Sequence, residues 1–333
     1  MSKVVYSLLT TGLMCLSAQS MADLATEPGF DFVLNINAGI GQAQSQSNTD
    51  KGNAVTYDLN NAGNEQSGVA AFALGRLSYT LSNKKTQLFF GNSEDNVVTG
   101  DFKAELGISQ EFDNGTIATL AYVPLLAKSE AWQDPFATKI KRSTTDVDSQ
   151  GARVRFENLF SQPLTIEYTW AEADFEQDFS GQQAHLGLSS AQQALLKRDA
   201  DYHQAHVEYA YALNDIFTIQ PSFTYTLGDS QGQAMAFEQG ELKATLISQL
   251  SERSQLATSL SFGQASYDHS HPVFNKVRAD DSWETFLFYS YDRPFDWDNT
   301  TFTAMAFYGQ KDSNINFYDE QGSGVSIGAA YRF

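Results

Sequence analysis

Hydrophobic and polar residues alternate along most of the chain with a period of two. In the clearest segment Thr, Gln and Ser alternate with an apolar set, namely Phe217, Ile219, Pro221, Phe223, Tyr225 and Leu227. Successive side chains of a β-strand point to opposite faces, so this period predicts strands that are apolar on one face. We count about fourteen such segments, although those at 67–81, 85–92 and 281–292 alternate poorly.

The connections between these segments alternate in length. Short turns are expected at 82–84, 113–115, 161–163, 214–215, 251–253 and 294–299. Longer polar loops are expected at 46–66, 93–100, 129–149, 176–200, 229–236, 268–280 and 312–321. Short turns at one rim and long loops at the other are typical of an up-and-down transmembrane β-barrel. We therefore predict an all-β fold, an antiparallel barrel of about fourteen strands, with twelve as the alternative count.

Aromatic residues lie near both ends of the predicted strands. The set near the short turns is Phe112, Phe160, Tyr211, Phe217, Tyr291, Trp297 and Phe302. The set near the long loops is Trp132, Trp170, Tyr225, Tyr267, Trp283 and Tyr308. Two such belts are expected where a barrel crosses both membrane interfaces. A secreted β-sandwich also alternates, but it needs neither strands this long nor loops sorted by length, so we favour the membrane barrel.

The first residues have the parts of an export signal, with Lys3, an apolar stretch at 4–16, and Ser20 and Ala22 at a cleavage site. We expect a signal peptide at 1–22 and a single barrel domain at 23–333. Cleavage would also remove the one cysteine of the chain, so the mature protein would form no disulfide. No later stretch approaches the ~18 apolar residues of a transmembrane helix.

Charge and motifs exclude several functions. The net charge of -19 argues against nucleic-acid binding. No Ser/His/Asp order or Gly-rich phosphate loop indicates an enzyme, and we expect no cofactor. His269 and His271 have a spacing that suits a metal, but they precede Pro272 in an expected solvated loop. Asp312 begins a calcium-loop pattern that is not completed, so we expect no metal site.

If the apolar residues face lipid, the opposite set lines the interior. Its charged members, our candidate pore-lining residues, are Lys103, Glu105, Arg153, Arg155, Glu157, Glu167, Glu208, Glu241 and Lys243. With Glu111 and Glu284 the acids outnumber the bases, which predicts a hydrated pore with a weak preference for cations. A closed interior in which the basic side chains pair with glutamates remains the alternative. In the 176–200 loop, Ser190 and Gln193 resemble a capping box and predict a short helix.

The last ten residues, GVSIGAAYRF, end on an aromatic residue within a strand-like alternation. Tyr331 and Phe333 fall on the apolar face with Val325, Ile327 and Ala329. In lipid every backbone polar group must be paired, so we expect the last strand to close against the first.

Several stretches resemble one known family. They are WQDPFA (132–137), GQAMAFE (232–238), HPVFNKVRADD (271–281), SNINFYDE (313–320) and the opening strand FVLNINAGIG. The chain resembles a Gram-negative outer-membrane family carried as domain of unknown function 2860. That resemblance implies an outer-membrane barrel and supplies no substrate or catalytic residue. Tyr331 and Phe333 also resemble the terminal signature that the barrel-assembly machinery recognises.

Together these observations predict a porin-like channel for passive passage of small polar solutes in the outer membrane of a Gram-negative cell. Both termini would be periplasmic and the long loops extracellular. Expected partners are outer-membrane lipid and lipopolysaccharide, the barrel-assembly machinery and small polar solutes. The alternative function is a closed barrel with a structural role or with surface loops that bind another molecule.

Overall fold

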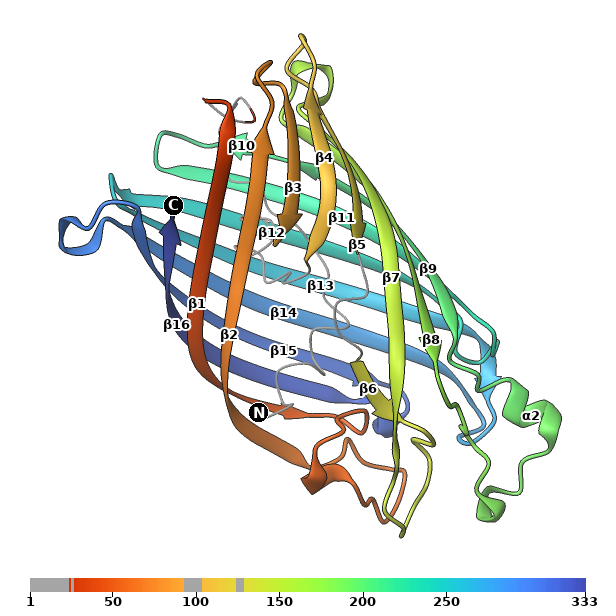
Figure 1. The fold of residues 1–333 in the computed structure, drawn as a ribbon. Coiled ribbons are helices and arrows are strands. Elements are labelled where there is room, and N and C mark those ends of the chain that lie inside the picture. The colour runs from red at the N-terminus through yellow and green to blue at the C-terminus, as the bar shows by residue number, and fades with distance from the viewer. Residues whose placement is uncertain (1–23, 25–26, 93–103, 124–128) are drawn as a thin grey trace.

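The computed structural model describes residues 24, 27–92, 104–123 and 129–333. In this part the chain forms one closed antiparallel β-barrel with very little helix (Figure 1). The predicted export signal at 1–22 and the candidate residue Lys103 lie outside the described residues. Among the described residues, no helix has the length and apolar character needed to cross a membrane.

The strands of the first half are β1 (Gly29–Gln44), β2 (Glu65–Thr80), β3 (Thr86–Gly91), β4 (Glu105–Glu111), β5 (Ile117–Val123), β6 (Ser129–Trp132), β7 (Thr144–Glu157) and β8 (Leu164–Phe175). Those of the second half are β9 (Ala200–Tyr209), β10 (Tyr211–Ala212), β11 (Phe217–Ser230), β12 (Phe237–Ser251), β13 (Ser254–His271), β14 (Lys276–Asp292), β15 (Thr300–Ser313) and β16 (Glu320–Arg332). The helical turns are η2 (Lys51–Asn53), η3 (Leu159–Ser161), η4 (Ala184–Leu186), α2 (Ser190–Ala194), η5 (Pro294–Asp296) and η6 (Asn316–Tyr318).

These segments form the predicted fourteen-stranded barrel. β5 and β6 pair with successive parts of β7, and β9 and β10 pair with successive parts of β11. β5 and β6 therefore occupy one strand position in the wall, and β9 and β10 occupy another. Consecutive positions pair in antiparallel order all the way round, as expected for an up-and-down barrel.

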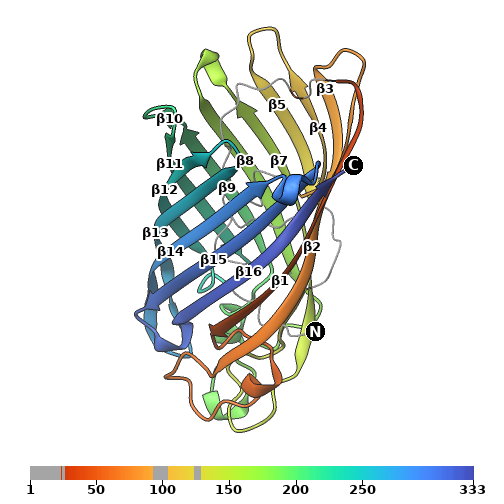
Figure 2. The same cartoon turned by 90° about the vertical axis from the view of Figure 1, so that its left-hand side faces the viewer.

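The last strand closes the barrel against the first, as predicted. β16 pairs with β1 from Arg332 opposite Val33 to Gln321 opposite Gln44 (Figure 2). The pairing extends to the final residue, because the Phe333 N–H donates to the Phe32 carbonyl at 2.9 Å and the two rings stack. Tyr331 and Phe333 both face outward and are exposed. The closed ladder leaves no unpaired edge between the first and last strands.

The barrel is apolar outside and polar inside. On β1, Ile36 and Ile40 are 60% and 62% exposed, whereas the intervening Asn37 is buried. On β16, Ile327 is 72% exposed between inward-facing Ser326 and Gly328. A soluble barrel would bury its large aliphatic residues, so this distribution is that of a transmembrane β-barrel. The predicted fold class is confirmed.

Two predicted loops and one predicted helix start were partly wrong. Residues 268–280 form the end of one hairpin, since β13 extends to His271 and β14 begins at Lys276. The 129–149 segment includes β6 and the start of β7. Polar residues misled the prediction because the strand ladder continues beyond the apolar belt. The helix α2 is capped by Ser189 with Gln192, one residue earlier than expected, because Ser and Gln each occur as doublets there.

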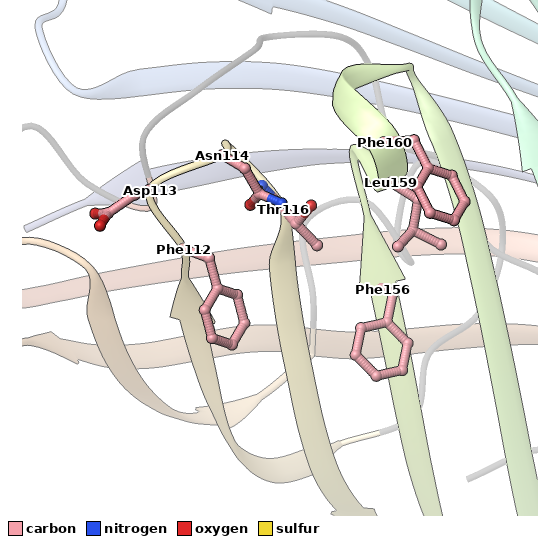
Figure 3. A pocket seen from close by; sticks show the side chains of 7 residues that line it. All are labelled: Phe112, Asp113, Asn114, Thr116, Phe156, Leu159 and Phe160. Atoms are coloured by element: carbon pink, nitrogen blue, oxygen red, sulfur yellow. The ribbon is translucent and has the colours of Figure 1, made fainter.

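The short turns gather at one rim, toward the upper left in Figure 1. In two of them an aromatic residue has a left-handed backbone, Phe160 with φ 57° and Phe295 with φ 55°. Their side chains are 80% and 77% exposed. Phe160, Phe112 and Phe156 line a hollow of about 490 Å³ at this rim. Figure 3 shows how their side chains lie. Aromatic residues therefore surround the short-turn rim, as predicted for an interfacial belt.

Candidate functional site

The interior of the barrel carries a continuous row of polar and charged residues. Residues directly opposite each other on neighbouring strands connect β4 to β12 through one register row. That row contains Ser109, Thr119, Arg155, Glu167, His206, Thr224 and Glu241. Hydrogen bonds run along it, with Ser109 and Thr119 hydroxyls 2.8 Å apart and His206 Nδ1 2.9 Å from Thr224 Oγ1. The fold thus aligns groups that are widely separated in the sequence.

Two arginines, Arg155 in this row and Arg153 beside it, form buried ion pairs. Arg153 Nη2 lies 2.5 Å from Glu105 Oε2, and its Nη1 lies 2.8 Å from Glu167 Oε2. Arg155 Nη2 lies 3.1 Å from Glu157 Oε1. Taking a charge out of water is costly unless it is paired and hydrogen-bonded, so these contacts hold the side chains in place. They form a charged wall held by ion pairs.

All eight described candidate residues have interior positions. Glu105, Arg153, Arg155, Glu167, Glu208 and Glu241 are buried, and Glu157 and Lys243 are partly buried. Their sequence neighbours on the other face include exposed Leu106, Phe156, Ile166, Val207 and Leu242. The structure therefore brings the candidates together on the inner wall. That they line a water-filled pore remains a prediction.

A second, apolar part of the inner wall was missed by the sequence analysis. Its buried core consists of Leu74, Ile247, Ala257, Phe286, Phe288 and Met305, with Phe72 and Phe307 packed against it. Phe286 pairs with Phe307, and Phe288 pairs with Met305, across β14 and β15. The outward residues Leu287 and Tyr289 of β14 are also apolar and exposed. Both faces of this strand are therefore apolar, which explains the poor alternation at 281–292.

Small residues on β16 make room for this apolar cluster. Leu74 reaches it from β2, although β16 and β1 separate β2 from β15 in the wall. On the intervening β16, a Cβ added to Gly324 would lie 2.5 Å from Cε1 of Phe307. The glycine is needed because the phenylalanine ring occupies that space. The sequence did not show this fit directly, because Gly324 and Phe307 come side by side only through the pairing of β15 with β16.

The long loops form a structure of their own, which we call the loop cap (45–64, 133–143, 176–199, 231–236, 272–275 and 314–319). Its apolar core contains buried Phe136, Leu196, Ile315 and Phe317. Partly buried residues from the other five loops pack around Phe136 of 133–143 and the rest of that core, namely Leu59, Leu186, Leu188, Met235, Val273, Phe274 and Tyr318. Loops that were expected to be polar and solvated therefore share one hydrophobic core.

The loop cap extends across the mouth of the barrel. Phe136, between β6 and β7, has its ring centroid 5.2 Å from that of Phe317 and 6.0 Å from that of Phe274. Phe274 lies between β13 and β14, and Phe317 lies between β15 and β16. Four strand positions separate β7 from β13 along the wall. Contacts between such distant loops must cross the mouth rather than follow the rim.

Arg142 fastens two loops of the cap together. Its Nη1 donates to the Gln46 carbonyl at 3.2 Å and to Gln46 Oε1 at 3.1 Å, and its Nη2 donates to the Asn53 carbonyl. The guanidinium also lies 4.4 Å from the centre of the Trp132 ring. Burial lowers the pKa of Arg142 to about 10, so the side chain remains charged at neutral pH. Arg142 is therefore a charged centre for hydrogen bonds between loops 45–64 and 133–143.

Two aspartates of the cap have different electrostatic environments. Asp178 accepts hydrogen bonds from Ser180 and lies 2.9 Å from Arg198. Burial opposes its ionisation, but Arg198 and these hydrogen bonds hold the pKa of Asp178 below its ordinary value. Asp134 accepts from the N–H groups of Phe136 and Gly181. There burial dominates and raises the pKa of Asp134.

His271 corrects the expectation of a solvated loop. It is the last residue of β13 and is fully buried, with Nε2 2.8 Å from the Tyr318 hydroxyl. Its ring packs against Phe136 and Phe274. Pairing and packing bury this histidine, so the adjacent Pro272 does not indicate solvent exposure. In the described part of the chain no three metal-ligating side chains come together.

Two aromatic residues of the expected long-loop belt also lie inside. Trp132 is 2% exposed and its Nε1 donates to the Gln46 carbonyl at 3.0 Å. Tyr267 is buried beneath the Arg278 guanidinium, which lies 4.6 Å from its ring centre and 3.6 Å from that of Tyr318. Arg278 is itself paired with Asp280. Residues near a long loop can serve the cap instead of the membrane interface.

The closed ladder, the apolar exterior and the charged interior define a transmembrane β-barrel. Residues 29–332 match the family described as "Protein of unknown function (DUF2860)". The chain belongs to this family, as the resemblance implied. No curated protein sequence matches the chain.

Several solved structures of membrane proteins resemble the barrel only distantly. In-vitro folded OmpT, an outer membrane protein of Vibrio cholerae, has a TM-score of 0.43 and 10% identity, covering 93% of this chain and 99% of that one. An anion-selective porin from Comamonas acidovorans has a TM-score of 0.44 and 10% identity, covering 92% and 100%. A FadL homologue of Pseudomonas aeruginosa has a TM-score of 0.43 and 12% identity, covering 91% and 90%.

Proposed function

We propose that this protein is a porin-like channel for passive passage of small polar solutes across the outer membrane of a Gram-negative cell. The observation that carries the proposal is the charged register row inside the barrel. A barrel that served only as a scaffold could fill its interior with apolar side chains without the cost of burying charges. A polar interior is what a hydrated path through a membrane barrel requires.

The proposed channel has a weak preference for cations. In and beside the charged row, Glu105, Glu157, Glu167, Glu208, Glu241 and Glu284 outnumber Arg153, Arg155 and Lys243. Excess carboxylates on a pore wall concentrate cations and repel anions. Several of them are neutralised by the arginines, so the preference is small.

In the proposed orientation the long loops are extracellular, and the short turns and both termini are periplasmic. The exposed apolar belt contacts outer-membrane lipid, and the loop cap lies near lipopolysaccharide. Tyr331 and Phe333, exposed beside the closing seam, serve as the signal for the barrel-assembly machinery. Solutes then reach the charged row from outside only through or around the loop cap.

A closed barrel with a structural or surface-binding role is the second candidate. The packed core of the loop cap favours it, because Phe136, Phe274 and Phe317 meet across the mouth. The two functions differ in one property, whether ions pass through the protein.

Planar-bilayer recording of the purified full-length protein under a KCl gradient tests the proposal. We expect discrete conductance steps and a reversal potential of the sign that indicates a modest preference for K⁺. That preference should weaken as salt rises, because charges are screened over ~10 Å at 0.1 M. Bilayers that contain heat-modifiable, folded protein yet stay silent would establish the closed barrel instead.

A further inference from the structure

A cavity of about 230 Å³ lies inside the barrel at its short-turn end. Most of its lining comes from inward-facing residues of the strands around the closing seam, from β13 through β16 and β1 to β2. Leu74 and Phe288, both of the apolar cluster, supply apolar surface. Most of the polar lining is uncharged, namely Asn35, Asn92, Gln255, Ser290, Asn299, Thr301 and Thr303. Apolar surface with fixed hydrogen-bonding groups is the usual composition of a small-molecule site.

The charged residues of the lining are engaged with other parts of the protein. The Arg76 guanidinium lies 4.0 Å from the centre of the Phe89 ring on the neighbouring β3. Arg332 Nη1 lies 3.6 Å from Asp31 Oδ1. Asp292 accepts a hydrogen bond from a threonine hydroxyl of β15 at 2.7 Å, and it is exposed at the short-turn rim, as Arg332 is. The buried part of the cavity therefore presents uncharged groups.

This buried part joins side chains from strands that are not neighbours. Asn35 belongs to β1 and Thr303 to β15, with β16 between them, yet Thr303 Oγ1 lies 3.5 Å from Asn35 Oδ1. The same Asn35 oxygen accepts a hydrogen bond from Asn37 Nδ2 at 3.1 Å. On β16, Gly328 lies opposite both Asn37 and Thr303, and a Cβ added there would overlap the Asn37 amide. The glycine therefore lets these side chains meet across β16.

Residues of β14 complete the buried part. Ser290 lies directly opposite Thr303, and Phe288 precedes Ser290 by two residues on the same inward face. Among the described residues, neither the Ser290 hydroxyl nor the Asn35 amide nitrogen makes a hydrogen bond. The cavity thus offers uncharged hydrogen-bonding groups beside an aromatic ring.

We propose that the cavity binds a small uncharged polyhydroxylated solute, the chemistry of a monosaccharide. The solute hydroxyls form hydrogen bonds with Asn35, Ser290 and Thr303. The apolar C–H face of its ring packs on Phe288. Since a water molecule occupies about 30 Å³, the volume corresponds to roughly eight waters, or a solute of about ten to twelve non-hydrogen atoms. The inference rests on the proposed function, because it names the class of solute that the channel would carry.

Isothermal titration calorimetry tests the solute chemistry, with the full-length protein in a detergent that has no sugar headgroup. The probes are D-glucose, D-glucosamine and D-glucuronate, which share a ring and differ in charge, at a slightly acidic pH that keeps the amine protonated. We expect D-glucose to bind and each charged sugar to bind at least about fivefold more weakly, because its charge loses water without gaining a partner. Equal or tighter binding of a charged sugar overturns the inference, and so does no binding of D-glucose.

Matched variants locate the site. Ser290→Ala should weaken D-glucose binding by about threefold to tenfold through a lost hydrogen bond, and Phe288→Leu by about fivefold through the lost ring face. Ser282→Ala is the control for the first, because Ser282 is on the inward face of the same strand but outside the lining. Phe286→Leu is the control for the second, because Phe286 belongs to the same apolar cluster and does not line the cavity.

Both controls should bind D-glucose as the wild type does, and a retained gel-mobility change on heating shows that each variant is folded. Unaltered affinity in both site variants, or equal weakening in their controls, rejects the site. Calorimetry needs no ion flow, so a silent bilayer would reject the channel and leave this result standing. Conductance without D-glucose binding would reject the site and leave the channel standing.

Discussion

The two ends of the barrel differ in how their connections are stabilised. At the long-loop end, six connections share an apolar core, and buried Arg142 and partly buried Arg198 join them. Side chains of these connections meet across the mouth. At the short-turn end, the connections are tight, Phe160 and Phe295 are exposed, and a cavity lies inside the wall. Because the cap has its own core, we infer that it can loosen while the strand ladder remains intact. Under the proposed function, the loop-cap end would control access and the short-turn end would anchor the barrel.

The largest expected effect comes from Arg142→Ala, which removes the shared hydrogen-bond donor of two cap loops. Hydrogen bonds to a charged group contribute about 1.5–3 kcal/mol each, so counting one bond to Gln46 and one to Asn53 the cap should lose roughly 3–6 kcal/mol of local stability. Hydrogen exchange of the Ala54 and Lys139 amides, both in the cap, should accelerate strongly.

Lys141→Ala is the matched control for this variant, because Lys141 is an exposed basic residue directly before Arg142. Exchange of the strand amides should be unchanged in both proteins. Equal acceleration in cap and strands after Arg142→Ala would mean that the cap and barrel unfold together.

A smaller effect is expected from Asp178→Asn, which breaks a buried pair with Arg198. Loss of one partner of a buried pair costs about 3–5 kcal/mol, and the remaining hydrogen bonds should reduce this toward the lower value. Asp134→Asn retains an oxygen acceptor for the Phe136 and Gly181 amides and resembles the neutral form that burial favours. It should therefore leave the protection of the cap amides from hydrogen exchange unchanged or slightly increased at neutral pH.

These two aspartates also predict how the cap responds to acid. The folded-state pKa of Asp178 is lowered, so its stabilising contribution is present above the ordinary value of 3.8 and is lost as pH falls through the folded value. The pKa of Asp134 is raised, so its contribution is present below 3.8 and is lost as pH rises through the folded value. After correction for intrinsic exchange rates, hydrogen exchange of the cap amides should show that acid loosens the cap less in Asp178→Asn than in Asp134→Asn. The reverse order contradicts these assignments.

At the other end, deletion of Phe333 should reduce the amount of assembled protein. The deletion removes a backbone hydrogen bond and a ring contact with Phe32, together about 1–2 kcal/mol, which corresponds to roughly a 5- to 30-fold change in an equilibrium constant. Heat-modifiable protein in the outer-membrane fraction measures assembly, and export should continue. In the molecules that do assemble, hydrogen exchange of the cap amides should be the same as in the wild type. Wild-type amounts of assembled protein would show that the closing seam does not need this residue.

The smallest expected effect concerns selectivity. Glu241→Gln should move the reversal potential toward zero without abolishing the preference for cations, because other carboxylates remain on the wall. Glu238→Gln is the matched control, since Glu238 lies three residues away on the outer face of the same strand. An equal shift in both variants would exclude the inner row as the source of selectivity.

Local patterns predicted the barrel but not how its loops meet. Alternation along β11 and the apolar terminal strand were sufficient to indicate an outward apolar face and a closing seam. Trp132 and His271 were misplaced because their burial depends on Gln46 and Tyr318, which are distant in the sequence. The sequence alone does not predict that a polar residue such as Arg142 will lie within a loop core.

The interior was predictable only in part, for a related reason. Strand alternation put Arg155, Glu167 and Glu241 on the inner face, but the register that aligns them depends on pairing between strands. Phe286 and Phe288 have the composition of lipid-facing residues and instead pack against Leu74 inside the barrel. A period of two assigns residues to the two faces of a strand, but it does not identify the lipid-facing one when both faces are apolar.

The most direct test of the account is single-channel recording of the wild-type protein beside Arg142→Ala. We expect the wild type to open rarely or to a small conductance, because the cap crosses the mouth. The variant should open more often or more widely, with the same weak cation preference, since the charged row is unchanged. A wild-type pore that is steadily open and indistinguishable from Arg142→Ala would contradict the claim that the loop cap controls this channel.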